Sequence, residues 1–391
     1  MSSMPTTLSP ATGAVTTTIT QRRRVVSGAG AVAHLPGLLD QVGIARVLVI
    51  CGKNIAAGPA LAVVLEALGG RVARVFDECT PHAQVETVDR IVDAVRGVEA
   101  DGIVALGGGS TLDAAKGASV LAAAGGVLAD MATRFEPPAQ YVVPPLSGPR
   151  VPVVAVPTTL SASDATISAG FTDPVRRSKM VIVDPEAPVR AVVLDPCVVA
   201  TTPQLVLAGS AGNALNHCVE ALYSRGHGPL TDAFATTALS LLVSSVEDAV
   251  AGDLEALGRC QTAAHLAGMA LPATGLGIAH AVCHALGAFG ASHGGANSVM
   301  VVHGLRFNRD SLGSQQSVIE RALGAPPQQA AEVMGDLLRR IGAPTGLRAL
   351  GLSQEDLPEI AAHAFADRHI YANPRPVRNV AEVEQLLQEA W

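Results

Sequence analysis

Positive charge is scarce in this chain of 391 residues. Lys and Arg together number 27 against 34 Asp and Glu, which gives a formal net charge of −7. The longest basic run is three consecutive arginines at 22–24. A nucleic-acid-binding protein needs a basic patch that neutralises phosphates, so the composition argues against a nucleic-acid partner.

The chain also lacks an unbroken apolar run as long as a membrane helix requires, because Gly, Pro or charged residues interrupt its most apolar segments. Its first twenty residues are rich in Ser and Thr and do not show the basic and then apolar order of a secretory signal. We expect residues 1–20 to form a disordered tail. The expected protein is soluble and cytoplasmic, with no membrane partner.

Cysteine is sparse, and none of it forms a CxxC motif; the six residues are Cys51, Cys79, Cys197, Cys218, Cys260 and Cys283. This spacing is typical of reduced thiols in a cytosolic protein and argues against a disulfide framework. Apolar residues are plentiful instead. Hydrophobic residues make up 49% of the chain and charged residues 16%, which favours large buried cores or subunit contacts. The length predicts about two domains.

The first half of the chain alternates apolar runs with amphipathic stretches. Runs of β-branched residues separated by helical patterns predict parallel strands covered by helices. The runs are at 46–51, 71–76, 101–110 and 151–156, and the helical patterns are at 59–69 and 85–97. We therefore predict a doubly wound α/β domain, in which ligands bind beyond the carboxyl ends of the strands.

The pattern changes from about Pro203 onward, where long windows rich in Ala and Leu carry apolar residues at helical spacing. The second half is therefore predicted to be all-helical. We place the boundary after the Asp195-Pro196 break, which gives an α/β domain over 21–198 and a helical domain over 199–391.

A glycine-rich loop follows the predicted strand at 101–106. It consists of three glycines and two hydroxyl residues that can cap the next helix, namely Gly107, Gly108, Gly109, Ser110 and Thr111. Glycines allow the backbone to approach a diphosphate closely, and the positive end of the helix dipole favours its charge. Asp113 and Lys116 on this helix would lie within reach of the ligand. The loop lacks the spacing of a GxGxxG fingerprint, so it predicts phosphate binding without identifying NAD.

The helical half carries several histidines at informative spacings. Asn213 and His217 are four residues apart and so share a helix face, as do His280 and His284, and His293 follows. One histidine on an apolar helix is usually a core residue, but repetition favours a shared site. Several imidazoles around one cleft can bind a divalent metal or act as acids and hydrogen-bond donors.

Five segments together resemble the iron-containing alcohol dehydrogenase superfamily, a likeness that extends from about Arg24 to Trp391. They are GGGSTLDAAKG (107–117), PTTLSASDATISAGFTD (157–173), LDP (194–196), GNALNHCVEALYS (212–224) and GIAHAVCHALGAFGASHGGANSVMVVHGLRFN (277–308). Within the superfamily the chain is most similar to the maleylacetate reductase branch. The features that suggest this branch are Asn213, where iron-dependent members have Asp, PHAQVET (81–87) and the tail from Asn373.

The resemblance implies an NAD(P)-binding α/β domain, an all-helical catalytic domain, hydride transfer in the cleft between them, and a homodimer. Residues that match the superfamily's cofactor motifs would face the diphosphate and nicotinamide: Gly107, Gly108, Gly109, Ser110, Thr158 and Thr159. Lys179 would approach the ribose. Many relatives have Asp where Gly52 lies, and with Gly there and Lys53 beside it a 2′-phosphate should be tolerated. Either NADH or NADPH could therefore serve.

The superfamily's metal site matches Asn213, His217, His280 and His293. An amide in place of the carboxylate removes the only anionic ligand, so a divalent ion would be held less firmly. Maleylacetate reductases resemble this arrangement and are regarded as working without a required metal. Hydride addition to maleylacetate develops an enolate, which imidazole donors can stabilise, and His280 or His284 would supply the proton.

One segment departs from the branch. Where maleylacetate reductases have a His-rich segment, this chain has His293 followed by GGAN, as in metal-dependent members, and the interval from His280 to His293 is one residue shorter than usual. The departure makes another unsaturated or carbonyl acid an alternative substrate, from a specialised biosynthetic pathway or from aromatic catabolism. The alternatives are a metal-dependent alcohol dehydrogenase acting on an aldehyde or ketone, and a cyclase or lyase of the dehydroquinate-synthase type.

Overall fold

A computed structural model describes residues 16–19, 23–136, 140–173, 178–186 and 189–391. The chain divides into two compact units, and the main division falls between Thr202 and Pro203. The predicted boundary after residue 198 lies four residues earlier. Two short excursions, Phe135–Tyr141 and Leu160–Ala162, group with the second unit.

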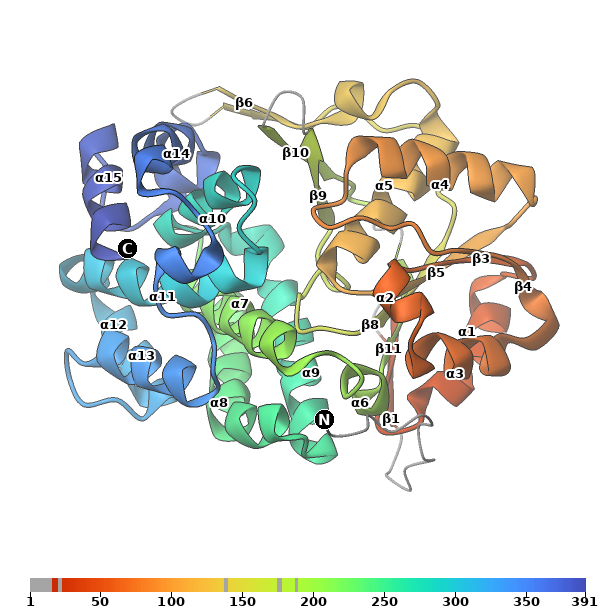
Figure 1. The fold of residues 1–391 in the computed structure, drawn as a ribbon, viewed down its shortest axis with the longest axis horizontal. Coiled ribbons are helices and arrows are strands. Elements are labelled where there is room, and N and C mark those ends of the chain that lie inside the picture. Colours follow the sequence, from red (N-terminus) through yellow and green to blue (C-terminus); the bar gives the residue numbers. More distant parts are fainter. Residues whose placement is uncertain (1–15, 20–22, 137–139, 174–177, 187–188) are drawn as a thin grey trace. The chain divides into compact units, whose positions relative to one another are not determined.

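The first unit is built on a seven-stranded sheet with the strand order β1-β2-β11-β8-β5-β3-β4. Its strands are β1 (Thr16–Ile19), β2 (Arg24–Ser27), β3 (Val47–Ile50), β4 (Val72–Phe76), β5 (Gly102–Gly107), β8 (Val153–Pro157) and β11 (Val189–Leu194). Six strands run parallel, and only β1 is antiparallel to its neighbour β2. The doubly wound α/β architecture predicted from the sequence is therefore present (Figure 1).

Successive side chains of the central strands point to opposite faces of the sheet, and both faces are covered by helices. Val47 and Val49 of β3 enter one apolar cluster, whereas Leu48 and Ile50 enter the other. One face is covered by α1 (Leu35–Val42) and α3 (Pro59–Leu68), and the other by α4 (Val85–Gly97) and α5 (Gly109–Ala124). Strands buried on both faces read as continuous apolar runs, which is why the sequence revealed β3 and β5.

Three features of the chain before Pro203 differ from the expectation. Thr16–Ile19 forms β1 although it was assigned to the disordered tail, because a run of β-branched residues pairs readily with β2; residues 1–15 of that tail lie outside the described residues. Two hairpins that were not predicted follow the fifth strand. They are β6 (Arg134–Glu136) with β7 (Gln140–Val142), and β9 (Ser168–Asp173) with β10 (Ser178–Val183).

The second unit is helical, as predicted. Its α-helices are α7 (Gln204–Tyr223), α8 (Pro229–Ala251), α9 (Leu254–Thr274), α10 (Ile278–Ala288), α11 (His293–Asn308), α12 (Ser314–Leu323), α13 (Ala330–Arg340), α14 (Leu357–Phe365) and α15 (Val380–Glu389). Two short helices complete the described set, α2 (Lys53–Ala56) after β3 and α6 (Pro196–Val199) before the division. The 3-10 turn η7 (Arg368–Ala372) follows α14.

Helix α7 is buried along nearly its whole length and is packed unusually closely against α11. A Cβ at Gly209 would lie 3.3 Å from the amide nitrogen of Gly295, and one at Gly212 would overlap the Ser298 side chain. These glycines let the two backbones approach. The close contact brings α7 alongside the first turns of α11, whose first residue is His293.

Helix α8 is long and apolar enough to cross a membrane by length and composition, the only single helix of the described residues that is. No such segment was expected from the sequence. It packs against α7 and α9, and it carries Asp232, Glu247 and Asp248.

Candidate functional site

The glycine loop lies where β5 ends and α5 begins. Gly107 is the last residue of β5, Gly108 is the N-cap of α5, and no side chain caps the helix. A Cβ at Gly107 would overlap Thr111, so this glycine is required for strand-to-helix packing. A Cβ at Gly108 would instead meet Thr159 at 3.0 Å. The uncapped helix start provides amides and a positive dipole end for an anion, which fits a cofactor diphosphate.

The other predicted cofactor residues of the first unit lie around this loop or at neighbouring strand ends. Thr158 follows β8, and its amide donates to the Gly107 carbonyl at 3.0 Å. Ser110 Oγ accepts a 3.0 Å hydrogen bond from the amide of His82. Lys179 lies on β10 beside Gly170, where a Cβ would be 2.7 Å from its Cε. Burial lowers the pKa of His82, and the Lys179 ammonium lowers it further.

Gly52 and Lys53 follow the end of β3, where Gly52 is the N-cap of α2. A side chain at Gly52 would meet the Cys79 carbonyl oxygen at 3.4 Å, which is an ordinary contact. Packing therefore does not require glycine at this position. Its presence leaves this strand end without a carboxylate.

Asp113 and Lys116 take part in a network within the unit. Asp113 accepts hydrogen bonds from Ser163 and from the amide of Gly170. Lys116 donates to Ser163, to Thr166 and to the carbonyl of Ser168 at 2.8–3.0 Å. Lys116 is 3% exposed, and burial lowers its pKa to about 8. The network fixes the segment after β8 to α5, and contact of Asp113 with the cofactor stays a prediction.

The low pKa of Lys116 predicts a pH-dependent stability. The pKa of an unfolded lysine is near 10.4. Between pH 8 and pH 10 the unfolded chain therefore binds more protons than the folded one. In this window the contribution of Lys116 to stability rises with pH. We expect the unfolding free energy of the parent, minus that of Lys116→Met, to rise by about 1 kcal/mol per pH unit in this window. Urea unfolding of both proteins at several pH values measures it, and a constant difference would contradict the assignment.

The histidines predicted to be catalytic gather in the second unit. The ring centroids of His217 and His280 are 4.7 Å apart and nearly parallel, and His293 lies 5.8 Å from His280. His284 lies 6.2 Å from His280 and 6.1 Å from His293. The structure thus brings all four together, from three helices. His369 extends the cluster at 5.4 Å from His284.

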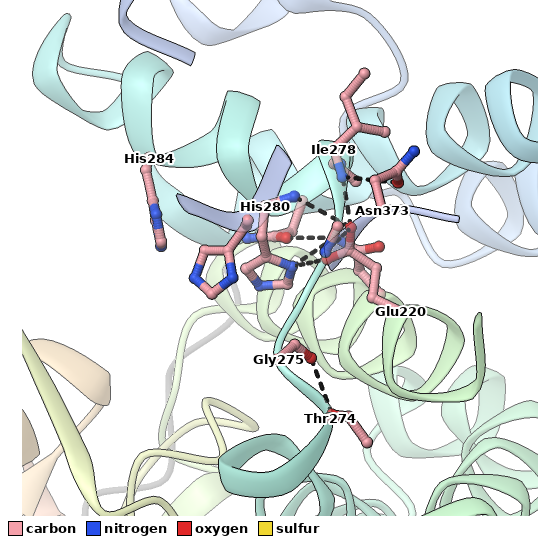
Figure 2. Close-up of polar contacts among 12 residues, drawn as sticks. Glu220, Thr274, Gly275, Ile278, His280, His284 and Asn373 are labelled. Atoms are coloured by element: carbon pink, nitrogen blue, oxygen red, sulfur yellow. Dashed lines mark hydrogen bonds and ion pairs between the residues drawn. The ribbon is translucent and has the colours of Figure 1, made fainter. Parts of the chain in front are cut away.

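A buried carboxylate that was not predicted lies beneath His280 (Figure 2). Glu220 is fully buried, and its Oε2 is paired with His280 Nδ1. Its Oε1 accepts hydrogen bonds from the amides of Gly277 and Ala279 at 3.0 and 3.1 Å, and from the Tyr223 hydroxyl at 3.0 Å. The carboxylate therefore also caps the start of α10, where an anion is stabilised by the free amides and the helix dipole.

The pairing with Glu220 leaves one ring nitrogen of His280 available to a ligand. Since Nδ1 is held by Glu220, only Nε2 remains, and this buried atom has no hydrogen-bond partner in the described part of the chain. A carboxylate on Nδ1 fixes the orientation of the ring, so Nε2 is the atom available to a ligand. When both ring nitrogens carry protons, His280 presents an N–H from Nε2 to a substrate oxygen.

Two asparagines connect His280 to His293. Asn216 Nδ2 lies 3.1 Å from His280 Nδ1 and donates to Asn297 Oδ1 at 2.6 Å. Asn297 Nδ2 in turn donates to the His293 carbonyl at 2.9 Å and lies 3.2 Å from its Nε2. Both asparagines are completely buried. The network holds the rings of α10 and α11 in a fixed relation.

His284 also has a carboxylate partner. Its Nδ1 lies 2.8 Å from Asp367 Oδ2. Asp367 is the N-cap of η7, where its Oδ1 accepts from the amide of His369 at 2.8 Å. Burial lowers the pKa of His369 well below its usual value, so its ring is neutral at neutral pH.

The metal position that the resemblance implies is only partly suited to an ion. Asn213 Oδ1 and His280 Nε2 are buried and have no hydrogen-bond partner among the described residues. The set contains no carboxylate, however, and His217, His280 and His293 do not bring their ligand atoms together. In the described ranges, one trio of His, Cys, Asp or Glu has ligand atoms within 4.8 Å of one another, and it is His284, Asp367 and His369. Asn213, His217, His280 and His293 therefore do not fit a firmly held metal.

Of the residues that the sequence did not reveal, Glu220 had a usable signal. It lies seven residues after Asn213 and three after His217, on the same face of α7. Asp367 and His369 gave no such signal, because 83 residues separate Asp367 from the histidine that it contacts.

Two family models together match nearly the whole chain. The model described as iron-containing alcohol dehydrogenase matches residues 22–196, and the C-terminal model of the Fe-containing alcohol dehydrogenase family matches residues 207–391. The chain belongs to the iron-containing alcohol dehydrogenase family. It is accordingly an NAD(P)-dependent oxidoreductase, and this confirms the family and fold expected from the sequence.

Relatives within the family differ in substrate. The chain is 32% identical to maleylacetate reductase 2 of Cupriavidus pinatubonensis over 94% of each chain. It is 30% identical to the NAD-dependent methanol dehydrogenase of Bacillus methanolicus, over 93% of this chain and 97% of the relative. A solved 1,3-propanediol oxidoreductase superposes with a TM-score of 0.86 at 28% identity, covering 97% of this chain and all of that one. These relatives support the family and leave the substrate open.

Proposed function

We propose that this iron-containing alcohol dehydrogenase family member is an NAD(P)H-dependent reductase of maleylacetate or a similar unsaturated or keto acid, and that it requires no metal. The observation that carries the proposal is the buried Glu220–His280 pair, whose free Nε2 can donate to an oxygen. Asn213 supports it, because an amide replaces the carboxylate that would hold a metal. The likeness to maleylacetate reductases at about 30% identity is consistent with it.

In the proposed reaction, different groups of residues bind the cofactor, donate the proton and contact the substrate. The glycine loop and uncapped start of α5 bind the diphosphate, and a bound dihydronicotinamide supplies the hydride. His280 Nε2–H donates to the substrate oxygen on which negative charge develops, while Glu220 stabilises the ring that carries the proton. His217, His284 and His293 surround His280 and complete a set of donors for the substrate's oxygens.

A panel of substrates tests this assignment. Loss of reduced-cofactor absorbance would be followed with maleylacetate, other keto acids and enones, and simple aldehydes, after treatment of the enzyme with chelator. We expect unsaturated or keto acids to be reduced with the highest kcat/KM. If simple aldehydes are preferred by tenfold or more, the proposed substrate class is wrong.

Replacement of Gly108 tests the cofactor loop. Gly108→Asp places a side chain against Thr159 and a negative charge where the diphosphate would bind. We expect the Kd of NADH, measured by fluorescence titration, to rise at least tenfold, or about 1.4 kcal/mol, with an unchanged melting temperature. Gly108→Ala is the matched control for the added carbon. Equal NADH affinity in Gly108→Asp and Gly108→Ala would show that the loop does not bind phosphate.

Cofactor choice provides a separate test, motivated by Gly52 and Lys53 at the end of β3. Without a carboxylate to repel a 2′-phosphate, NADPH should be used with a kcat/KM within about tenfold of that for NADH, a difference of roughly 1.4 kcal/mol. Gly52→Asp, which the space at this position permits, should shift the preference toward NADH. A parent enzyme that prefers NADH by several orders of magnitude would contradict this interpretation.

The remaining proposals concern location, oligomeric state and partners. We propose that the protein acts in the cytoplasm as a homodimer on a small-molecule substrate, without a membrane or nucleic-acid partner. The scattered, reduced cysteines and the net charge of −7 support this view. Sedimentation of the purified protein would measure the oligomeric state.

A further inference from the structure

We propose that His284, Asp367 and His369 form a binding site for a divalent transition metal such as Zn²⁺, at a position different from the one that family resemblance implies. Their ligand atoms all lie within 4.8 Å of one another. This metal trio is enclosed, because the side chains of His284 and Asp367 are 14% and 18% exposed and His369 is buried. Two imidazoles and a carboxylate are a donor set that suits Zn²⁺, Fe²⁺, Co²⁺ and Ni²⁺.

The backbone holds the metal trio in place before any ion binds. Asp367 caps η7 through Oδ1, which accepts from the amide of His369, and this leaves Oδ2 directed at His284 Nδ1 at 2.8 Å. His284 is fixed on α10, whose start is capped by Glu220 and by Asn373, the latter accepting from the Ile278 amide at 3.1 Å (Figure 2). A preorganised set of ligands loses little conformational entropy when it binds an ion.

Charge explains why this position is preferred to the one at Asn213. The carboxylate of Asp367 provides the anionic ligand that the amide of Asn213 does not. The nearest competing cation in sequence, Arg368, contacts Tyr141, with its guanidinium 4.7 Å from the ring centroid. Protons compete with a metal ion for imidazole and carboxylate ligands, so affinity should fall in acid.

Three protein ligands leave coordination positions open for water or for another oxygen donor. The ring of His284 is 6.2 Å from that of His280, so the ion would lie next to the proposed proton donor without using its Nε2. A metal on His284 would prevent that residue from donating a proton. The proposal is thus separate from the role of His280, and each can fail without the other.

Metal binding to the whole enzyme tests the proposal directly. Protein freed of metal by chelator would be titrated with Zn²⁺ against a chromophoric chelator, and with Co²⁺ while its visible absorption is recorded. We expect about one ion per chain. Asp367→Asn and His369→Gln should each weaken Zn²⁺ binding by more than about 100-fold, beyond the effect of losing an outer hydrogen-bond partner, and should change the Co²⁺ spectrum. Asn213→Ala, the matched control, should bind as the parent does.

The opposite pattern would overturn the assignment. Weaker binding in Asn213→Ala with unchanged binding in Asp367→Asn would place the ion at the family position, and no binding by the parent would show that no such site exists. His369→Gln keeps the Asp367 cap of η7, so it separates loss of a ligand from loss of local structure. Melting temperatures of all variants would confirm that they are folded.

Discussion

Replacing His280 with Gln is expected to lower kcat by about 10²–10³-fold, because it removes the group that stabilises charge on the substrate oxygen. Glutamine occupies a similar volume and can still accept or donate near Glu220, but it cannot transfer a proton. Steady-state kinetics with the best substrate of the panel would measure the loss. His217→Ala and His293→Ala should each lower kcat as well, since both rings adjoin His280.

A buried histidine outside the cluster provides the matched control. His303 on α11 is 7% exposed, and burial lowers its pKa to about 4, but it contacts none of the site's rings. His303→Gln should leave kcat within about twofold of the parent. If His280→Gln and His303→Gln lose activity equally, the loss reflects disturbed packing and the proposed proton donor is wrong.

We expect Glu220 to act through His280 as a positioning residue, and the separate effects on kcat and KM distinguish this role from a purely structural one. Glu220→Gln removes the carboxylate that holds His280 Nδ1, so kcat should fall while KM changes little. Leaving a buried polar group without its partner also costs about 1–3 kcal/mol of stability. An unchanged kcat with only a lower melting temperature would mean that Glu220 serves the fold alone.

The sequence predicts the parts of the fold in which local pattern and burial agree. Strands β3 and β5 are buried on both faces and read as continuous apolar runs, and α4 begins and ends where its helical pattern does. Strand β2 is fully buried only at its two middle residues and lies next to the edge strand, so it gave no comparable signal. The hairpin β9–β10 contains Gly170 and charged ends and reads as a loop.

The sequence predicted which histidines belong to the candidate site. It did not predict how these residues contact one another. Spacing on α7 and α10 places His217 beside Asn213 and His284 beside His280, because residues four apart share a helix face. Which faces meet depends on the close packing of α7 and α11 at Gly209 and Gly212, and no local pattern encodes that pairing. Asp113 shows the same limit, since its place on the phosphate-loop helix did not reveal the hydrogen bonds that its carboxylate accepts from Ser163 and Gly170.

The replacement Asn213→Asp should create the firm metal site that the parent lacks at this position. It returns an anionic ligand to a buried oxygen that has no hydrogen-bond partner in the described part of the chain, beside the rings of His217 and His280. We expect Zn²⁺ affinity at this position to rise by more than about 100-fold, exceeding the usual effect of an outer-sphere change. A gain in melting temperature on adding Zn²⁺ that exceeds the gain of the parent would report it, since an ion at 100 times its Kd stabilises by about 2.7 kcal/mol.

Chelator treatment of the parent enzyme in the same experiment distinguishes metal-independent from metal-dependent reduction. With histidine donors, chelator should leave its kcat nearly unchanged, and Asn213→Asp loaded with Zn²⁺ should bind metal without becoming faster on the native substrate, because the ion would occupy Nε2 of His280. Asn213→Ala controls for loss of the amide. Should the parent lose activity to chelator and regain it with Fe²⁺ or Zn²⁺, metal-independent reduction is refuted. A metal-dependent alcohol dehydrogenase, with Asn213 Oδ1 and His280 Nε2 as ligands, would then be the function.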